Sequence, residues 1–297
     1  IMLPEPLTLP PNRLWRMVYA AGVGALMYCY QTFEISNAYT LAFTPEVALL
    51  IGSLFSFAVR LATGGARRTV LDVTAMRPAA DRTHVLQTSA RGGAPRFRPG
   101  QWTTVSAPRW SAPLWTRSRR VFSYVNSPGQ EPEFAFTAST PASDFKAALI
   151  DGTATRLYLD DQGGDFVPHR RTGRQTVLIA SGIGITPMIS MIRAAGESGT
   201  DALSGITLVH VLRAADREVY DDDLRHARAA GATVQVLVSP QLAAGSDGFD
   251  DLVEAVGTPA PGAHYYVSGT PAFVDGATAA LRRIDPSLRR NPLRLPR

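Results

Sequence analysis

The residues best placed to do chemistry form a turn between a predicted strand and a predicted helix. Residues 176–180 are an apolar β-type run, and a helical pattern covers residues 187–195. Gly182 and Gly184 would let a ligand approach the backbone N–H groups closely, and Pro187 suits a first helical turn. Because a helix N-terminus attracts anions, this turn is typical of a phosphate site, although an ordinary strand–helix connection has the same outline.

A second polar turn, Ser268-Gly-Thr-Pro271, follows the last predicted strand, residues 264–268. Between the two turns, predicted strands at 206–212 and 233–238 alternate with predicted helices. This α/β alternation predicts a parallel sheet covered by helices, with ligands at the carboxyl ends of its strands. Both turns are therefore expected to face one crevice.

The region ahead of these elements has a different pattern. Short alternating runs, separated by Gly, Pro and Ser, occupy residues 70–75, 84–88, 101–106, 120–125, 133–137 and 155–159. Six short strands with turns between them predict a small antiparallel β-barrel. One helical stretch at 143–150 interrupts the strands, and Asp144 suits its start.

Four motifs follow one another along this barrel region: Phe97-Arg-Pro-Gly-Gln-Trp102, Arg120-Val-Phe-Ser123, Ser143 before a helix, and Gln162-Gly-Gly-Asp-Phe166. Their order resembles that of the flavin domains of the ferredoxin–NADP reductase family. The resemblance implies that the barrel binds FAD.

The resemblance also assigns roles to the second motif. Arg120 would pair with a flavin phosphate, Phe122 would stack on the isoalloxazine, and Ser123 would hydrogen-bond near the reactive N5. These roles suit the side chains, since a guanidinium offers phosphate a bidentate fork and a flat ring offers a stacking face. Taken alone, the motif also fits a surface arginine and a core phenylalanine. The implied FAD site further includes Val121, Thr137 and Ser143, with Ser143 capping the helix that faces the pyrophosphate.

The two polar turns match the same family in order. Its nicotinamide domain begins with G-x-G-x-x-P and ends with a strand followed by C-G-x-P, where this chain has Ser268 instead of cysteine. The resemblance implies NAD(P)H binding, with Ser123 and Ser268 at the reaction centre. The implied nucleotide-binding residues are Gly182, Gly184, Thr186, Pro187, Arg213, Gly269 and Pro271. NADH is favoured because no arginine follows the third strand, although Arg213 after the second strand leaves NADPH open.

Two apolar segments, residues 17–33 and 41–60, precede both predicted domains. Each is near the lower length limit for crossing a bilayer. Arg13 and Arg16 precede the first segment and Arg67 follows the second, so the positive-inside rule predicts a membrane hairpin with cytoplasmic ends. A pair of buried core helices is the alternative. The expected domains are a membrane hairpin at 1–66, an FAD-binding barrel at 67–172 and an NAD(P)-binding α/β domain at 173–297.

The predicted hairpin is similar to the final helices of the membrane subunits of Rnf-type and sodium-pumping NADH:quinone reductase complexes. This similarity lies in residues 13–24 and 44–55. It implies a larger membrane region and contact with membrane lipid. The expected location is the cytoplasmic membrane, with the flavin and nucleotide domains on the cytoplasmic side.

Composition narrows the expected partners. Cys29 is the only cysteine and the five histidines are scattered, so we expect no metal site, haem pair or cysteine-ligated cluster within the chain. The net charge of +5 comes mostly from arginine, but no basic helix carries interleaved aromatics, which argues against nucleic acid. The expected electron acceptor is a separate protein, a quinone, or a domain upstream of Ile1, because a chain without an initial methionine can be a fragment.

Two functions fit these observations. The first is a membrane-tethered flavoprotein reductase that moves electrons from NAD(P)H through FAD to a one-electron or quinone-type acceptor. The second is a non-catalytic nucleotide-sensing or assembly subunit of a membrane redox complex. Serine in place of the cysteine at position 268 favours the second function slightly.

Overall fold

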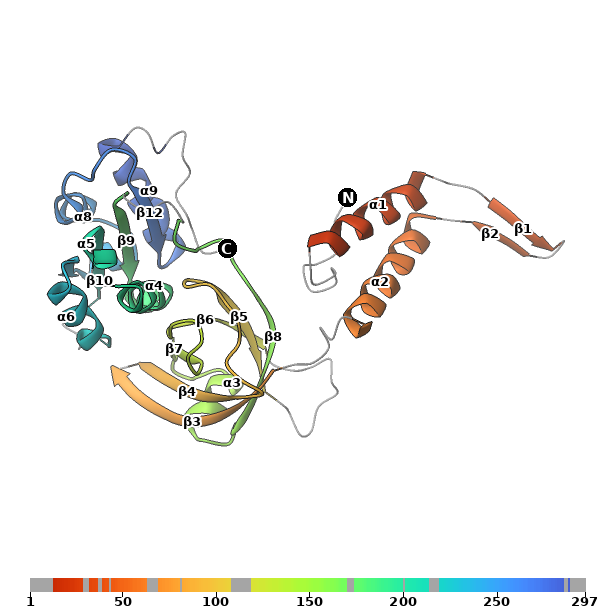
Figure 1. Cartoon of the computed structure of the whole chain (residues 1–297), viewed down its shortest axis with the longest axis horizontal. Helices are drawn as coiled ribbons and strands as arrows, with labels where there is room; N and C mark the ends of the chain where they lie inside the picture. The colour runs from red at the N-terminus through yellow and green to blue at the C-terminus, as the bar shows by residue number, and fades with distance from the viewer. Residues whose placement is uncertain are drawn as a thin grey trace. The chain divides into compact units, whose positions relative to one another are not determined.

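The computed structural model describes residues 13–28, 32–36, 39–42, 44–62, 69–80, 82–107, 119–169, 174–199, 201–213, 219–285 and 288. The chain divides into two compact units, Ile1–Arg68 and Thr69–Arg297, which are described separately (Figure 1).

The first unit is a helical hairpin with a β-hairpin at its turn. Its elements are α1 (Arg13–Tyr28), β1 (Thr32–Ser36), β2 (Tyr39–Ala42) and α2 (Pro45–Ala62). The two helices pack through Trp15 and Phe55, whose ring centroids are 5.8 Å apart. Gly52 lies against Tyr19 and Val23, so the helices approach closely there. The strands β1 and β2 take up residues that the sequence assigned to the ends of the two apolar segments.

The predicted pair of transmembrane helices finds no support in this unit. Among the described residues, no helix is both long enough and apolar enough to cross a membrane. The resemblance to the Rnf-type subunits and the location at the cytoplasmic membrane stay predictions.

The second unit begins with the predicted antiparallel barrel. Its elements are β3 (Thr69–Ala80), β4 (Thr83–Arg91), β5 (Trp102–Ser106), β6 (Arg119–Ser123), β7 (Glu133–Thr137), α3 (Asp144–Ile150) and β8 (Arg156–Gly163). The strand order is β6-β5-β8-β3-β4-β7, and the first and last strands of this order contact each other. The sheet therefore curls into a barrel, as predicted. Phe122, Phe134 and Leu71 fill its interior, and Phe145 and Leu149 of α3 pack against them.

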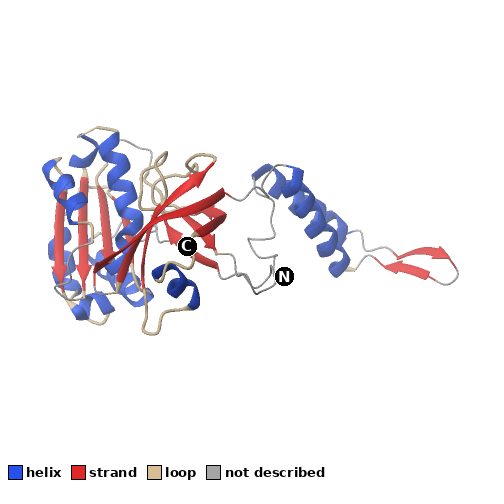
Figure 2. Ribbon diagram, turned by 90° about the horizontal axis from the view of Figure 1, so that it is seen from below, coloured by secondary structure: helices blue, strands red, loops and turns tan. Residues whose placement is uncertain are grey.

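The predicted parallel α/β domain follows. Its strands are β9 (Thr176–Ser181), β10 (Ile206–Leu212), β11 (Thr233–Val238) and β12 (His264–Ser268), in the order β11-β10-β9-β12. Helices cover both faces of the sheet (Figure 2). They are the 3₁₀ helix η3 (Gly182–Ile185) and the α-helices α4 (Thr186–Glu197), α5 (Asp201–Ser204), α6 (Asp221–Ala229), α7 (Pro240–Ala244), α8 (Phe249–Val256) and α9 (Pro271–Ile284).

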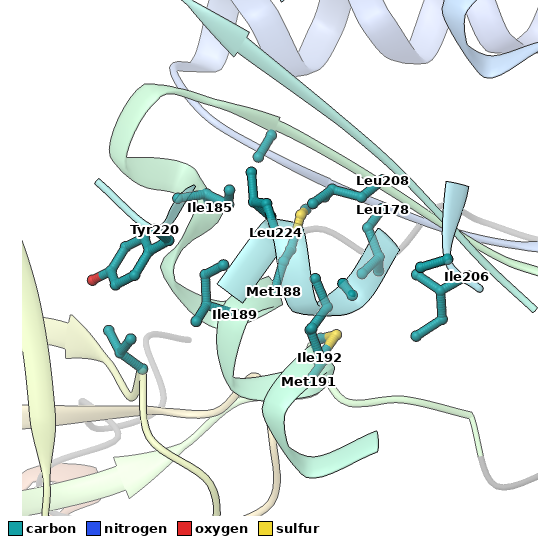
Figure 3. Packing of buried hydrophobic residues seen from close by; sticks show 14 of the residues in the cluster. Leu178, Ile185, Met188, Ile189, Met191, Ile192, Ile206, Leu208, Tyr220 and Leu224 are labelled. Atoms are coloured by element: carbon teal, nitrogen blue, oxygen red, sulfur yellow. The ribbon is translucent and has the colours of Figure 1, made fainter. Parts of the chain in front are cut away.

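One hydrophobic cluster joins the barrel to the α/β domain. Met188 and Ile189 of α4 pack on Leu178 of β9 (Figure 3). Tyr220, which directly precedes α6, and Leu224 within α6 lie close to them. The same cluster includes buried barrel residues, namely Val85, Val125, Ala135 and Phe166. Burial of each large apolar side chain contributes about 1.5–3 kcal/mol. The shared core therefore holds α4 between the sheet and the barrel.

Candidate functional site

The glycine turn between β9 and α4 starts from a rigid strand. All of β9 after Thr176 is buried, and the chain then passes through η3 before α4 begins. Gly182 has φ +53°, and a Cβ added to it would meet no heavy atom of the described residues within 4 Å. Its peptide is therefore open to a ligand. Thr186 Oγ1 donates to Ile183 O at 3.1 Å, and Pro187 lies in the first turn of α4.

The two polar turns predicted to share a crevice lie against each other. A Cβ on Gly184 would be 2.8 Å from Ser268 O and 3.0 Å from Gly269 N. Only glycine fits this contact, because both neighbouring atoms belong to backbone. The topology explains the contact, since β9 and β12 are adjacent parallel strands whose carboxyl ends meet.

The second turn is held in place by helix α9. Thr270 Oγ1 accepts a hydrogen bond from Phe273 N at 3.3 Å, which caps the helix, and Pro271 follows in its first turn. Gly269 packs against Phe273 and Ser181. Ser268, which stands where the resemblance expects cysteine, is 5% exposed at the end of β12.

The side chain of His210 holds the glycine turn through a hydrogen bond, a role that the sequence did not indicate. Its side chain is 2% exposed on β10, and Nε2 lies 2.9 Å from Gly182 O. A carbonyl can only accept, so Nε2 carries the proton of this hydrogen bond. The bond fixes the carbonyl of the residue whose open peptide begins the turn.

On the barrel side, β6 carries the motif that the resemblance assigned to FAD. Arg120 is exposed, and Val121 is 61% exposed. Phe122 is only 6% exposed, and its ring centroid lies 5.8 Å from that of Phe136 and 6.1 Å from that of Phe145. Its ring therefore fills the barrel core, as in the alternative interpretation of the motif. This arrangement does not support the predicted stacking on the isoalloxazine, because Val121 occupies the open side of the strand.

A group of polar atoms that suits a diphosphate lies where β6, β7 and α3 meet. Among the described residues, Ser143 Oγ is buried without a hydrogen-bond partner. Lys146 Nζ donates to Thr137 O at 2.5 Å. Burial lowers the pKa of Lys146, and the positive charge of Arg120 lowers it further. Two neighbouring cations and an unsatisfied hydroxyl are what the phosphates of FAD would complement, so these residues fit the cofactor.

The two glycine-containing motifs of the barrel contact each other. Gln101 Nε2 donates to Gly164 O at 3.2 Å, and Gly164 lies against the indole of Trp102. Gly100, with φ +86°, packs on the carbonyl of Phe166 and on Met191 of α4. The motifs therefore form the joint between the barrel and the α/β domain.

For two predicted site residues, Ser123 and Arg213, the described contacts do not indicate a role in cofactor binding. Ser123 is half-buried at the end of β6, opposite Trp102 of β5. Arg213 is exposed just after β10, and the residues that follow it, including Arg217, lie outside the described part of the chain. The choice between NADH and NADPH stays a prediction.

Comparison with known proteins agrees with this arrangement. A family model of the oxidoreductase NAD-binding domain matches residues 178–279, which include both turns. The flavohemoprotein of Bordetella pertussis is 28% identical over 198 residues, covering 62% of this chain and 48% of that protein. Methane monooxygenase component C of Methylosinus trichosporium is 27% identical over 157 residues, covering 52% of this chain and 44% of that protein. The chain therefore spans about half the length of the curated relatives it matches.

Solved structures share the fold. The FAD/NAD-binding domain of nitric oxide dioxygenase from Vibrio cholerae superposes with a TM-score of 0.57 at 17% identity, covering 77% of this chain and 96% of that one. A ferredoxin NADP⁺ reductase from Neisseria gonorrhoeae with bound FAD and NADP has a TM-score of 0.57 at 15% identity, covering 74% and 92%. Phthalate dioxygenase reductase has a TM-score of 0.60 at 19% identity, covering 78% and 68%.

The family match lies on the half that carries both turns, and the fold match extends over the barrel as well. Together they show that residues 178–279 match an oxidoreductase NAD-binding domain, and that the second unit has the fold of known FAD/NAD-binding reductases.

Proposed function

We propose that the chain is a reductase module that passes electrons from NAD(P)H, through FAD, to a one-electron acceptor protein. The observation that carries this proposal is the contact of Gly184 with Ser268 and Gly269, beside a barrel that shares its core with the same domain. When bound, the nicotinamide supplies a hydride, and the flavin takes up its two electrons and can release them singly to the acceptor.

The chain's own residues bind and orient the two cofactors. The open peptide of Gly182 and the N-terminus of α4 would receive the dinucleotide pyrophosphate, while the turn at Ser268 closes the far side of the crevice. Arg120, Lys146 and Ser143 would hold the phosphates of FAD. The shared core fixes the two half-sites relative to each other.

The acceptor is supplied from outside the described residues. The relatives include flavohemoproteins and methane monooxygenase component C, and one similar structure transfers electrons from pyridine nucleotides to [2Fe-2S]. These likenesses favour a protein acceptor, either a separate partner or a further domain of a longer chain. A quinone at a lipid surface is the second acceptor that the sequence predicts, and membrane tethering has no further observation in its favour.

Acceptor preference can be measured with FAD-reconstituted protein. NADH oxidation is followed with ferricyanide, with a plant-type [2Fe-2S] ferredoxin and with a short-chain ubiquinone in detergent. The proposal predicts reduction of ferricyanide and of the ferredoxin, with electrons arriving one at a time. Efficient reduction of the quinone alone would contradict a protein acceptor. Absence of NADH oxidation with every acceptor, in protein that retains FAD, would favour the non-catalytic nucleotide-sensing or assembly role.

A further inference from the structure

Arg193 connects three elements from both halves of the second unit. It lies on α4, and its Nε and Nη2 donate to Asp223 of α6 at 2.7 and 2.9 Å. Its Nη1 lies 3.4 Å from Glu133 Oε1 at the start of barrel strand β7. One arm of this network is therefore internal to the α/β domain, and the other crosses to the barrel.

The network is partly shielded from solvent. The side chains of Arg193, Glu133 and Asp223 are 25%, 17% and 20% exposed. The guanidinium also lies over the Tyr220 ring, 5.8 Å from its centroid. Burial alone would lower the pKa of Arg193, but the hydrogen bond to Asp223 and the two carboxylate charges outweigh it and raise the pKa. Charge pairs in such surroundings are stronger than surface pairs, and removing one partner is costly.

Other hydrogen bonds of the described residues also join α4 to the barrel. Ser190 Oγ donates to Asn126 O at 2.8 Å, and Gln130 Nε2 donates to Glu197 Oε1 at 2.6 Å. Beside Arg193 lies a groove of about 870 Å³, lined by both domains and including Glu133 and Tyr220. The Arg193–Glu133 pair thus joins the two domains at the wall of this groove.

We propose that Arg193 is a positioning residue that sets the angle of the α/β domain against the flavin barrel through Glu133. This inference rests on the proposed transfer from nicotinamide to flavin, and it assigns a role in that step to a residue outside the cofactor-binding turns.

The geometry of α4 explains how the effect reaches the site. The helix begins at the phosphate-binding turn, and Arg193 lies six residues beyond Pro187, about 9 Å along the axis. A helix is stiff over this length, so a tilt permitted at Arg193 displaces Gly182 and Gly184 relative to the barrel. A misplacement of about 1 Å can reduce the rate of a positioned reaction by roughly 100-fold.

The test separates the arm to the barrel from the internal arm. Glu133→Gln removes the charge on the barrel side and leaves the Arg193–Asp223 pair intact. Arg193→Met removes both arms, and Arg193→Lys retains a charge without the fork. Arg283→Met is the matched control, because Arg283 pairs with Asp250 on the exposed surface of the same domain.

Two measurements are made on each variant of the full chain. Hydrogen–deuterium exchange in protein without nucleotide reports the protection of residues 126–133 and of α4. Stopped-flow absorbance of the FAD-loaded protein gives the rate of flavin reduction at saturating NADH and the apparent dissociation constant for NADH.

Glu133→Gln and Arg193→Met are expected to lose protection at the joint and to slow flavin reduction about 10- to 100-fold. Their NADH dissociation constants and FAD content should stay within about twofold, Arg193→Lys should be intermediate, and Arg283→Met should match the wild type. Unchanged protection and rate in Glu133→Gln would overturn the inference, as would an equal loss in Arg283→Met. Failure of NADH to reduce the wild type would count against the proposed function instead, and the exchange data would still test the joint.

Discussion

Replacement of Gly184 by alanine tests the contact that joins the two turns. The added Cβ would lie 2.8 Å from Ser268 O, 2.9 Å from Ser268 C and 3.0 Å from Gly269 N. An ordinary contact begins near 3.4 Å, so the turns must separate by about 0.6 Å at the closest pair. The end of β12 cannot yield easily, since Ser268 is in register with Ala180 of β9.

The cost of this overpacking is about 1–3 kcal/mol. If NADH binds only when the two turns are in contact, its binding must push the turns of the alanine variant back into the overpacked contact. The same energy then appears as a loss of affinity, about 5- to 150-fold at room temperature. Gly184→Ala should therefore lower both the thermal midpoint and the affinity for NADH.

Isothermal titration with NADH and thermal unfolding measure both effects. Gly196→Ala is the matched control, because Gly196 lies in α4, the helix that follows the turn, and among the described residues its Cβ would meet Leu203 Cδ1 at an ordinary 3.6 Å. We expect this control to bind NADH like the wild type and to be equally or slightly more stable. Wild-type affinity and stability in Gly184→Ala would refute the reasoning that the turns must touch for binding.

Three further predictions concern other residues of the site. Arg120→Ala should weaken FAD binding by about 2 kcal/mol, roughly 30-fold, through loss of a charge-assisted phosphate contact, and full FAD occupancy on dialysis would show that Arg120 does not hold a phosphate. Because phosphates favour protonated Lys146, whose pKa is lowered by burial and by Arg120, FAD affinity should be highest below that pKa and fall as pH rises through it. Lys146→Met should abolish this slope in an FAD titration across pH, and a slope that persists would implicate another group. His210→Phe should weaken NADH binding about fivefold or more by leaving Gly182 O unsatisfied, whereas His210→Gln should recover most of it, and equal losses in both would point to packing alone.

The sequence predicted both halves of the second unit for physical reasons that the structure retains. Alternation of period two predicted the barrel strands, and strand–helix alternation predicted the parallel sheet. The meeting of the turns at Gly184 and Ser268 followed from topology, because parallel strands end at one edge. These features can be predicted from one sequence because each depends on a local pattern of residues.

Features that depend on packing between distant segments escaped prediction. In the sequence, Phe122 fits either face of its strand, and the barrel pairing of β6 with β5 directs its ring inward. The Arg193–Glu133 pair joins residues sixty positions apart, and it exists only because the two domains dock. His210 gave no signal, since its role comes from the parallel alignment of β10 with β9.

The first unit shows a different limit. Apolar composition and basic flanks predicted a bilayer-spanning pair, but helix boundaries decide whether a segment is long enough. Among the described residues, α1 ends at Tyr28 and β1 covers Thr32–Ser36, so part of the first apolar segment lies in a strand. Composition alone did not indicate this change of secondary structure.

The visible absorbance of the purified chain, before and after anaerobic NADH, tests the central claim most directly. The account predicts yellow protein, either as isolated or after addition of FAD, whose flavin absorbance bleaches with one equivalent of NADH. Protein that stays colourless after FAD is added and dialysed, or bound flavin that NADH cannot bleach, would contradict it.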